Sequence, residues 1–250
     1  MEARRPGRMI ERRTTAGDGR LETKTVRKLA LRFVGEAIMI VVSVYVAIVL
    51  QGISSDRGQE AMARESLRTV RAELLADQQK AQEYAHQKEE RAVLFSRLSR
   101  WLNSGGPIPA DSFGVALEGV LTGNITAFPR RAAWTTMVSQ GQLEFVRDPE
   151  LVGRLAGLYD RWADRVSYNG QAYDEALWSV TRTTVPSIWD RRTSRFLRSD
   201  REERLELDGQ LYHLEIWNDS YGALLDRWAE EIGRTLVDVD RYLGRHGGGA

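Results

Sequence analysis

The sequence predicts an all-α protein, in which an N-terminal transmembrane helix continues into an antiparallel helical bundle. Two observations support this prediction. Residues 33–53, FVGEAIMIVVSVYVAIVLQGI, form a long apolar run that contains a single charge. Beyond it, apolar residues recur at helical spacing, and no stretch shows the alternation of apolar and polar residues that is typical of a half-buried strand.

The apolar run has the length and character of a membrane span. As a helix it extends about 31 Å, which matches a hydrocarbon core of about 30 Å. No charge lies between Ala37 and Leu50, and apolar residues surround the helix on all sides. Glu36 follows Arg32 by four residues, so we expect an ion pair at headgroup depth. The alternatives are a buried helix of a soluble protein and a removable signal sequence, but no small-x-small cleavage site follows the run.

The distribution of charge predicts the orientation. Residues 1–32 carry a net charge of +6, whereas residues 54–250 carry −4. Basic residues accumulate on the cytoplasmic side of a span. Only four of the 36 Lys and Arg residues are Lys, a bias typical of bacteria with GC-rich genomes. We therefore expect a bacterial inner (plasma) membrane protein, with its N-terminus in the cytoplasm and its main domain in the periplasm.

Four segments follow from this reading. Residues 1–24 lack periodicity and are predicted to be a disordered, basic cytoplasmic tail. Residues 25–53 form the juxtamembrane segment and the transmembrane helix. Residues 54–245 form the extracytoplasmic helical bundle, and residues 246–250 are a second disordered tail.

The first bundle helix has a heptad pattern. With Leu67 at position a, the a and d positions are Leu67, Val70, Leu74, Asp77, Ala81, Tyr84, Lys88, Arg91, Phe95, Leu98 and Leu102. Eight of these eleven are apolar, and the three polar exceptions lie in the middle of the helix. We expect the helix to end near Leu102, because SGGPIP follows.

Start and stop signals define the later helices. Asp111 is the expected N-cap of a short helix over 111–121, and a second short helix is predicted over 131–146, with a loop near Gly141. The Asp148-Pro149 pair predicts the start of a long helix that ends before Pro186. The last helix carries an apolar stripe that reaches Leu243.

The motifs argue against several chemistries. The sequence has no cysteine, which excludes disulfides, thiol catalysis and cysteine-based metal sites. Glu83 and His86 have the Glu-x-x-His spacing of di-metal bundles, but both lie outward in the heptad, and His213 has no matching glutamate. The run 191–206 mixes arginines with acids and is read as a solvated connector. We predict no enzyme, no catalytic, cofactor-binding or metal-binding residue, and no nucleic-acid partner.

Two stretches resemble a known family. GEAIMIVVSVYVAIVLQGISSDR with ESLRTVRAELLAD, and AAWTTMVSQGQLEFVRDPELVGRLAGLYDRW, are similar to uncharacterised bacterial single-span membrane proteins with a helical extracytoplasmic domain. The second signature corresponds here to Trp134, Gly141, Leu143, Leu151 and Tyr159. The resemblance covers roughly residues 30–80 and 130–165. It implies topology and no catalytic residue, because the family is a domain of unknown function.

The favoured function is a membrane-anchored structural or interaction module, whose partners are the lipid bilayer and another envelope protein or a second copy. This reading expects an exposed apolar or aromatic patch and no buried polar cluster. The alternative is a ligand-binding sensory domain with a pocket between helices, for which Trp162, Tyr173 and Arg182 are candidates. An enzyme would require clustered ionisable groups with shifted pKa values.

The seven tryptophans are expected to fill the core.

Overall fold

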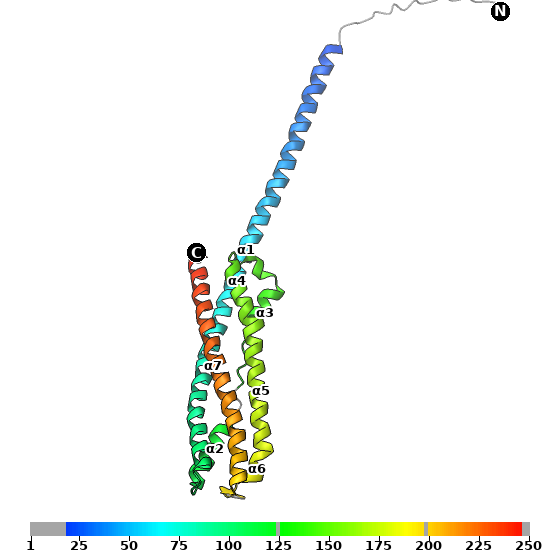
Figure 1. The fold of residues 1–250 in the computed structure, drawn as a ribbon. Coiled ribbons are helices and arrows are strands. Elements are labelled where there is room, and N and C mark those ends of the chain that lie inside the picture. Colours follow the sequence, from blue (N-terminus) through cyan, green and yellow to red (C-terminus); the bar gives the residue numbers. More distant parts are fainter. Residues whose placement is uncertain (1–18, 124–125, 198–199, 247–250) are drawn as a thin grey trace, which may run out of the picture. The chain divides into compact units, whose positions relative to one another are not determined.

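A computed structural model describes residues 19–123, 126–197 and 200–246 (Figure 1). Over residues 19–55 it describes the backbone, and side chains only at Met39, Val42, Ser43 and Tyr45. The chain divides into two units, residues 1–57 and 58–250, and each is described by itself. Helix α1 spans Gly19–Asn103 and contributes residues to both units.

In the first unit the predicted disordered tail at 1–24 lies mostly outside the described residues, and Gly19 onward is helical. Within the part of the chain that the structure describes, no helix is both long and apolar enough to cross a membrane. The predicted span at 33–53 lies largely outside the described side chains. Among those that are described, Ser43 Oγ donates a hydrogen bond to the carbonyl oxygen of Met39 at 2.7 Å.

The second unit is a mostly helical bundle, which confirms the all-α part of the predicted fold class. After α1 come α2 (Ala110–Leu121), α3 (Ala132–Ser139), the 3-10 turn η1 (Gln142–Phe145), α4 (Pro149–Ala156), the π-helical turn η2 (Gly157–Trp162), α5 (Ala163–Arg182), α6 (Thr184–Ile188), β1 (Trp189–Asp190), β2 (Arg195–Phe196) and α7 (Arg201–His246). Figure 1 shows α5 and α7 running side by side, and these two helices contact each other.

The heptad pattern predicted for α1 is confirmed. Every a position from Leu67 to Leu102 is buried, and among the d positions only Tyr84 is half-buried, with Ala85 buried beside it. Two polar contacts show that α7 runs antiparallel to α1. Nε of Arg71 lies 2.5 Å from Oδ1 of Asp240, and near the other end Nδ2 of Asn103 donates to Oδ2 of Asp208 at 2.8 Å.

The cap predicted for the second helix is wrong, whereas the one predicted for the fourth is confirmed. Helix α2 begins at Ala110, so Asp111 lies in its first turn, and Pro109 at the N-cap provides no side-chain hydrogen bond. A carboxylate in the first turn still favours the helix through its dipole. At the start of α4, Oδ1 of Asp148 accepts a hydrogen bond from the backbone N–H of Leu151 at 3.0 Å.

The predicted long helix from Pro149 is interrupted twice. The π-helical turn η2 adds a residue to one turn, and as a result the consecutive residues Leu158 and Tyr159 are both buried. After α5 the chain continues as α6, which contains Pro186 instead of ending before it. Pro186 is the third residue of α6, where a backbone N–H has no intrahelical partner and its loss is tolerated.

A short hairpin that the sequence pattern did not indicate follows α6. Strands β1 and β2 are antiparallel, and Trp189 pairs with Phe196. The turn forms because the Asp190 carboxylate accepts hydrogen bonds from the Arg192 N–H at 2.9 Å and the Thr193 hydroxyl at 2.7 Å. The two aromatic rings also pack edge to face, with their centroids 4.9 Å apart. Part of the stretch read as a solvated connector is therefore an ordered hairpin.

Candidate functional site

The first candidate site is a groove between α4, η2 and α7, with a volume of about 510 Å³. It is lined by Glu150, Gly153, Arg154, Gly157, Leu158, Arg161, Trp162, Glu231 and Thr235. Gly153 and Gly157 lie one turn apart, and a Cβ added at either position would meet no atom within 4 Å. The missing side chains of these two glycines therefore help to open the groove.

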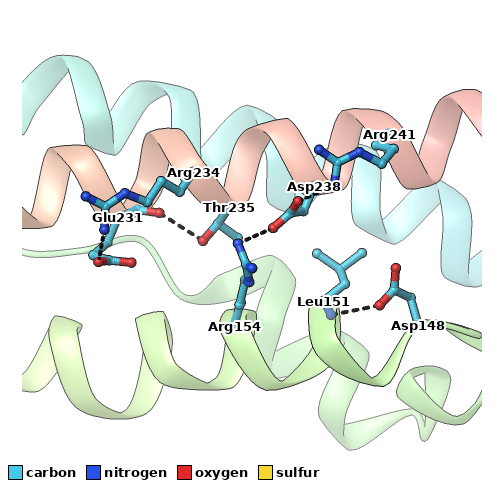
Figure 2. Close-up of polar contacts among 8 residues, drawn as sticks. All are labelled: Asp148, Leu151, Arg154, Glu231, Arg234, Thr235, Asp238 and Arg241. Atoms are coloured by element: carbon cyan, nitrogen blue, oxygen red, sulfur yellow. Dashed lines mark hydrogen bonds and ion pairs between the residues drawn. The ribbon is translucent and has the colours of Figure 1, made fainter.

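Arg154 joins α4 to α7 at this groove (Figure 2). Its Nη1 lies 2.5 Å from Oδ2 of Asp238, and Oδ1 of Asp238 accepts a hydrogen bond from Nη1 of Arg241 at 2.7 Å. The Asp238 side chain is 16% exposed, so solvent screens these ion pairs only in part. Because Asp238 is already paired with two arginines, we interpret it as part of a joint between the helices rather than as a reactive group.

The second candidate site is a buried polar layer in the C-terminal part of α1, centred on Lys88, which is 2% exposed. Nζ of Lys88 lies 3.9 Å from the ring centroid of Tyr173 on α5 and 5.0 Å from that of Tyr221 on α7. Gly222 makes room for the lysine stem, since a Cβ there would lie 3.2 Å from Lys88 Cβ. The amino group thus lies against two aromatic rings inside the bundle.

Arg91 and Asp174 complete this layer. Arg91 follows Lys88 by almost one turn, is 9% exposed, and its Nη2 donates to the carbonyl oxygen of Thr122 at 2.5 Å. Asp174 on α5 is 8% exposed, and its Oδ2 accepts a hydrogen bond from the Thr126 hydroxyl. Two basic side chains and one acidic side chain therefore share one buried layer, which the interaction-module reading did not expect.

Burial decides the charge of Lys88. It lowers the pKa of the Lys88 amine to about 6, an effect that the Arg91 guanidinium adds to and the Asp174 carboxylate opposes. Burial also raises the pKa of Tyr173 to about 12. At neutral pH the layer then holds an uncharged amine and two uncharged phenols. The charges of Arg91 and Asp174 balance each other.

Helix α7 holds the layer in place through two side chains. Asn218 is fully buried, and its Nδ2 donates to the Lys88 carbonyl oxygen at 2.8 Å, while its Oδ1 accepts from the Tyr173 hydroxyl at 3.4 Å. The Tyr221 hydroxyl accepts a hydrogen bond from the Ala127 N–H at 2.9 Å. These contacts link α1, α5, α7 and the segment after α2.

A second polar layer lies three turns earlier in α1. Asp77 is 4% exposed and accepts hydrogen bonds from both the backbone N–H and Nη1 of Arg130, each at 2.8 Å. Burial raises the pKa of Asp77, and the contacts with Arg130 oppose this rise. One turn before Asp77, Glu73 accepts from the Ala133 N–H at 3.2 Å, at the start of α3. These carboxylates fasten the segment before α3 to α1.

The three residues predicted to line one pocket do not meet. Trp162 lies in the α4–α7 groove, whereas the guanidinium of Arg182 lies 4.9 Å from the ring centroid of Trp178 on the surface. Tyr173 is fully buried in the Lys88 layer. The tryptophans fill or border the core as predicted, except for Trp178, which is 53% exposed.

The Glu-x-x-His pair lies on the surface, as its heptad positions predict. The Glu83 side chain is 51% exposed, and the His86 side chain is 70% exposed and lies near Glu89 and Glu90. In the described part of the chain, no group of three or more histidine and acidic residues is placed to hold a metal ion.

Sequence reasoning did not identify the Lys88 layer, although one signal pointed to it. Asp77, Lys88 and Arg91 are the polar exceptions among the a and d positions of α1, and all three are buried. A charged residue at a core position needs a partner inside the bundle. The partners on α5 and α7 follow no local spacing, so the sequence alone does not name them.

The fold and the site define the class of protein: a helical bundle with two buried polar layers in its core, one around Lys88 and one around Asp77. Residues 113–190 match a family of unknown function (DUF6090), which confirms the resemblance to an uncharacterised family for this part of the chain. The match includes the signature around residues 130–165 and does not extend to the one around 30–80. No curated protein and no solved structure matches the chain significantly.

Proposed function

We propose that the chain is a single-pass bacterial inner-membrane protein whose periplasmic bundle binds another envelope protein. Residues 33–53 span the bilayer in this proposal, with the preceding basic segment in the cytoplasm. The sequence supports it through the uncharged run from Ala37 to Leu50 and the excess of basic residues before it. The proposed role is non-enzymatic.

Side chains of the first unit are consistent with a lipid-facing helix. Met39, Val42 and Tyr45 are 73%, 54% and 68% exposed. On a helix of a water-soluble protein, large apolar residues face the core and polar residues occupy the exposed positions. The Ser43 hydroxyl satisfies its hydrogen bond within the helix, as a polar group surrounded by lipid must.

The observation that carries the docking role is a second apolar face on α7. Leu207, Leu211 and Leu214 face the core and are at most 2% exposed. On the opposite side, Leu205, Tyr212 and Ile216 are 48%, 63% and 48% exposed. Their spacing of seven and four residues places them in one row along the helix. We call this row, Leu205, Tyr212 and Ile216, the outer row. An apolar row facing solvent is typical of a binding surface.

The charges around the outer row indicate the kind of partner. Residues 202–219 contain six acidic residues and one arginine, a net charge of −5 with histidine neutral. Burial raises the pKa of Glu215, and the nearby Asp219 and Asp208 carboxylates raise it further. A second copy would bring like charges together, whereas an amphipathic helix with basic flanks would relieve this repulsion. We therefore favour a basic helix of another protein over self-association.

Photo-crosslinking in intact cells tests the docking surface. A photoreactive residue at Tyr212 is expected to give one discrete adduct with an envelope protein, identified by mass spectrometry. Tyr168 on α5 is a matched control, because it is 72% exposed and lies outside the outer row. Identical adducts at Tyr212 and Tyr168, or adducts only with a second copy, would contradict the proposed partner.

A reporter fusion tests the topology separately. Alkaline phosphatase fused after Leu243 is expected to be active, since that enzyme folds only in the periplasm. The double variant Tyr212→Ser with Ile216→Ser should keep the reporter active while it loses the crosslinked partner. An inactive reporter would refute the membrane topology whatever the crosslinking shows.

A further inference from the structure

Two buried basic side chains in the Lys88 layer have nitrogen atoms without an acceptor among the described residues. Within the described residues, neither Nζ of Lys88 nor Nη1 of Arg91 has a hydrogen-bond partner. Burying such a donor without a partner costs about 1–3 kcal/mol, and more for a charged group. Lys88 is at an a position and Arg91 at the following d position of α1, so both donors lie on the buried side of the helix in the same layer. A pair of buried donors of this kind points to an acceptor that the described residues do not provide.

A surface groove borders this layer. It has a volume of about 360 Å³ and is lined by Leu121, Thr122, Gly123, Asp174, Leu177, Trp178, Thr181 and Arg191. Gly123 lines the groove, and a Cβ at this position would lie 3.3 Å from Nη2 of Arg91, so the guanidinium lies close to the groove wall. Leu121, Leu177 and Trp178 give the groove a largely apolar wall.

We propose that the Lys88 layer binds the carboxylate of a small organic acid between Nζ of Lys88 and Nη1 of Arg91, with the apolar part of that acid in the groove against Trp178. A carboxylate presents two acceptor oxygens, which match the two unpaired donors. A groove of about 360 Å³ has room for the apolar part of a small organic acid. This site is independent of the outer row on α7.

Charge balance predicts that the acid binds together with a proton. The charged and titratable groups that face Lys88 are Arg91 on α1, Tyr173 and Asp174 on α5, and Tyr221 and Asp219 on α7. Without ligand, the Lys88 amine is neutral and Arg91 balances Asp174. A carboxylate adds one negative charge, which the layer accommodates when Lys88 takes up one proton from solvent.

Calorimetric titration of the full-length protein in detergent micelles tests the site, with acetate, butyrate and phenylacetate as probes at constant ionic strength. We expect phenylacetate to bind more tightly than acetate, with uptake of one proton measured in buffers of different ionisation enthalpy. The affinity should fall roughly tenfold for each pH unit above the pKa of Lys88. Binding without proton uptake, or no binding by any probe, would overturn the proposal.

Matched variants locate the binding site. Arg91→Gln and Lys88→Met should abolish binding, whereas Arg161→Gln, an exposed arginine of the α4–α7 groove, should bind like the wild type. Arg91→Gln and Lys88→Met change core residues and could prevent folding. Trp178→Ala provides a second test, because Trp178 is 53% exposed and its loss leaves the core intact. It should weaken phenylacetate more than acetate. Equal effects of Trp178→Ala on both probes, or unchanged binding by Arg91→Gln, would refute this location.

Discussion

The carbonyl oxygen of Lys88 on α1 accepts a hydrogen bond from Nδ2 of Asn218 on α7 at 2.8 Å, although the two residues are 130 positions apart in sequence. The same layer contains the Lys88 amine, whose pKa burial lowers to about 6. Lys88 therefore links α1 to two other helices: its backbone carbonyl accepts a hydrogen bond from α7, and its uncharged amine lies against α5. The hydrogen bond joins α1 to α7 at one position, and the lowered pKa of Lys88 predicts that stability depends on pH.

Replacing Lys88 with methionine is expected to remove that pH dependence. In the unfolded chain the lysine keeps its proton up to about pH 10.5, whereas in the folded protein it releases it above about pH 6. Between these values the unfolded state binds more protons, so the free energy of unfolding of the wild type should rise by up to about 1.4 kcal/mol per pH unit. Urea unfolding at a series of pH values measures this slope.

Lys88→Met should show a much smaller slope and, near pH 7, a free energy of unfolding higher by about 1–4 kcal/mol, the range found when buried ionisable groups are replaced by apolar ones. Lys80 on the exposed side of α1 is the control, and Lys80→Met should keep the wild-type slope. Equal slopes for Lys88→Met and the wild type would show that the amine is not buried in neutral form.

Two tyrosine-to-phenylalanine changes should have different effects. The Tyr221 hydroxyl accepts a hydrogen bond from the Ala127 N–H, so Tyr221→Phe should lower the free energy of unfolding by about 1–2 kcal/mol. The buried Tyr159 hydroxyl has no hydrogen-bond partner among the described residues. Tyr159→Phe should therefore leave stability unchanged or raise it by up to about 1 kcal/mol. Thermal and urea unfolding compare the two, and a large loss in Tyr159→Phe would reveal a missed partner.

Glycines on the two sides of the bundle provide another matched pair. At Gly170 a Cβ would lie 2.6 Å from the Tyr221 hydroxyl and 2.9 Å from Thr126 Cα, so Gly170→Ala should cost about 1–3 kcal/mol. At Gly153 in α4 nothing lies within 4 Å, and Gly153→Ala should stabilise the helix by about 0.5–1 kcal/mol. Chemical denaturation of both variants should show opposite signs. Two shifts of the same sign would argue against this packing.

Removing the Asp77 carboxylate should loosen the segment before α3. Asp77→Ala leaves the Arg130 N–H without its acceptor, and we expect a loss of about 1–3 kcal/mol. Asp77→Asn keeps an acceptor oxygen and should lose less. Hydrogen exchange at the Arg130 and Ala133 amides measures the local effect. Exchange as slow in Asp77→Ala as in the wild type would mean that other contacts hold the segment.

Local signals in the sequence predicted most of the helices. The a and d positions of α1, the cap at Asp148 and the stop after Asn103 depend on neighbouring residues and on helix geometry, and the structure places them as expected. The prediction was wrong where non-local packing decides. The hairpin at Trp189 and Phe196 forms because both rings also pack against Phe113 on α2, more than 70 residues earlier in the chain.

By itself the sequence determined that this protein is helical, which side of α1 faces inward, and that three charged residues interrupt that side. Periodicity and charge are properties of neighbouring residues, so a linear chain records them. Only the tertiary structure decided that Lys88 lies between Tyr173 and Tyr221, and that Leu205, Tyr212 and Ile216 face away from the core. Those facts depend on how distant helices are rotated against each other, which burial and close packing settle only once all of them have come together.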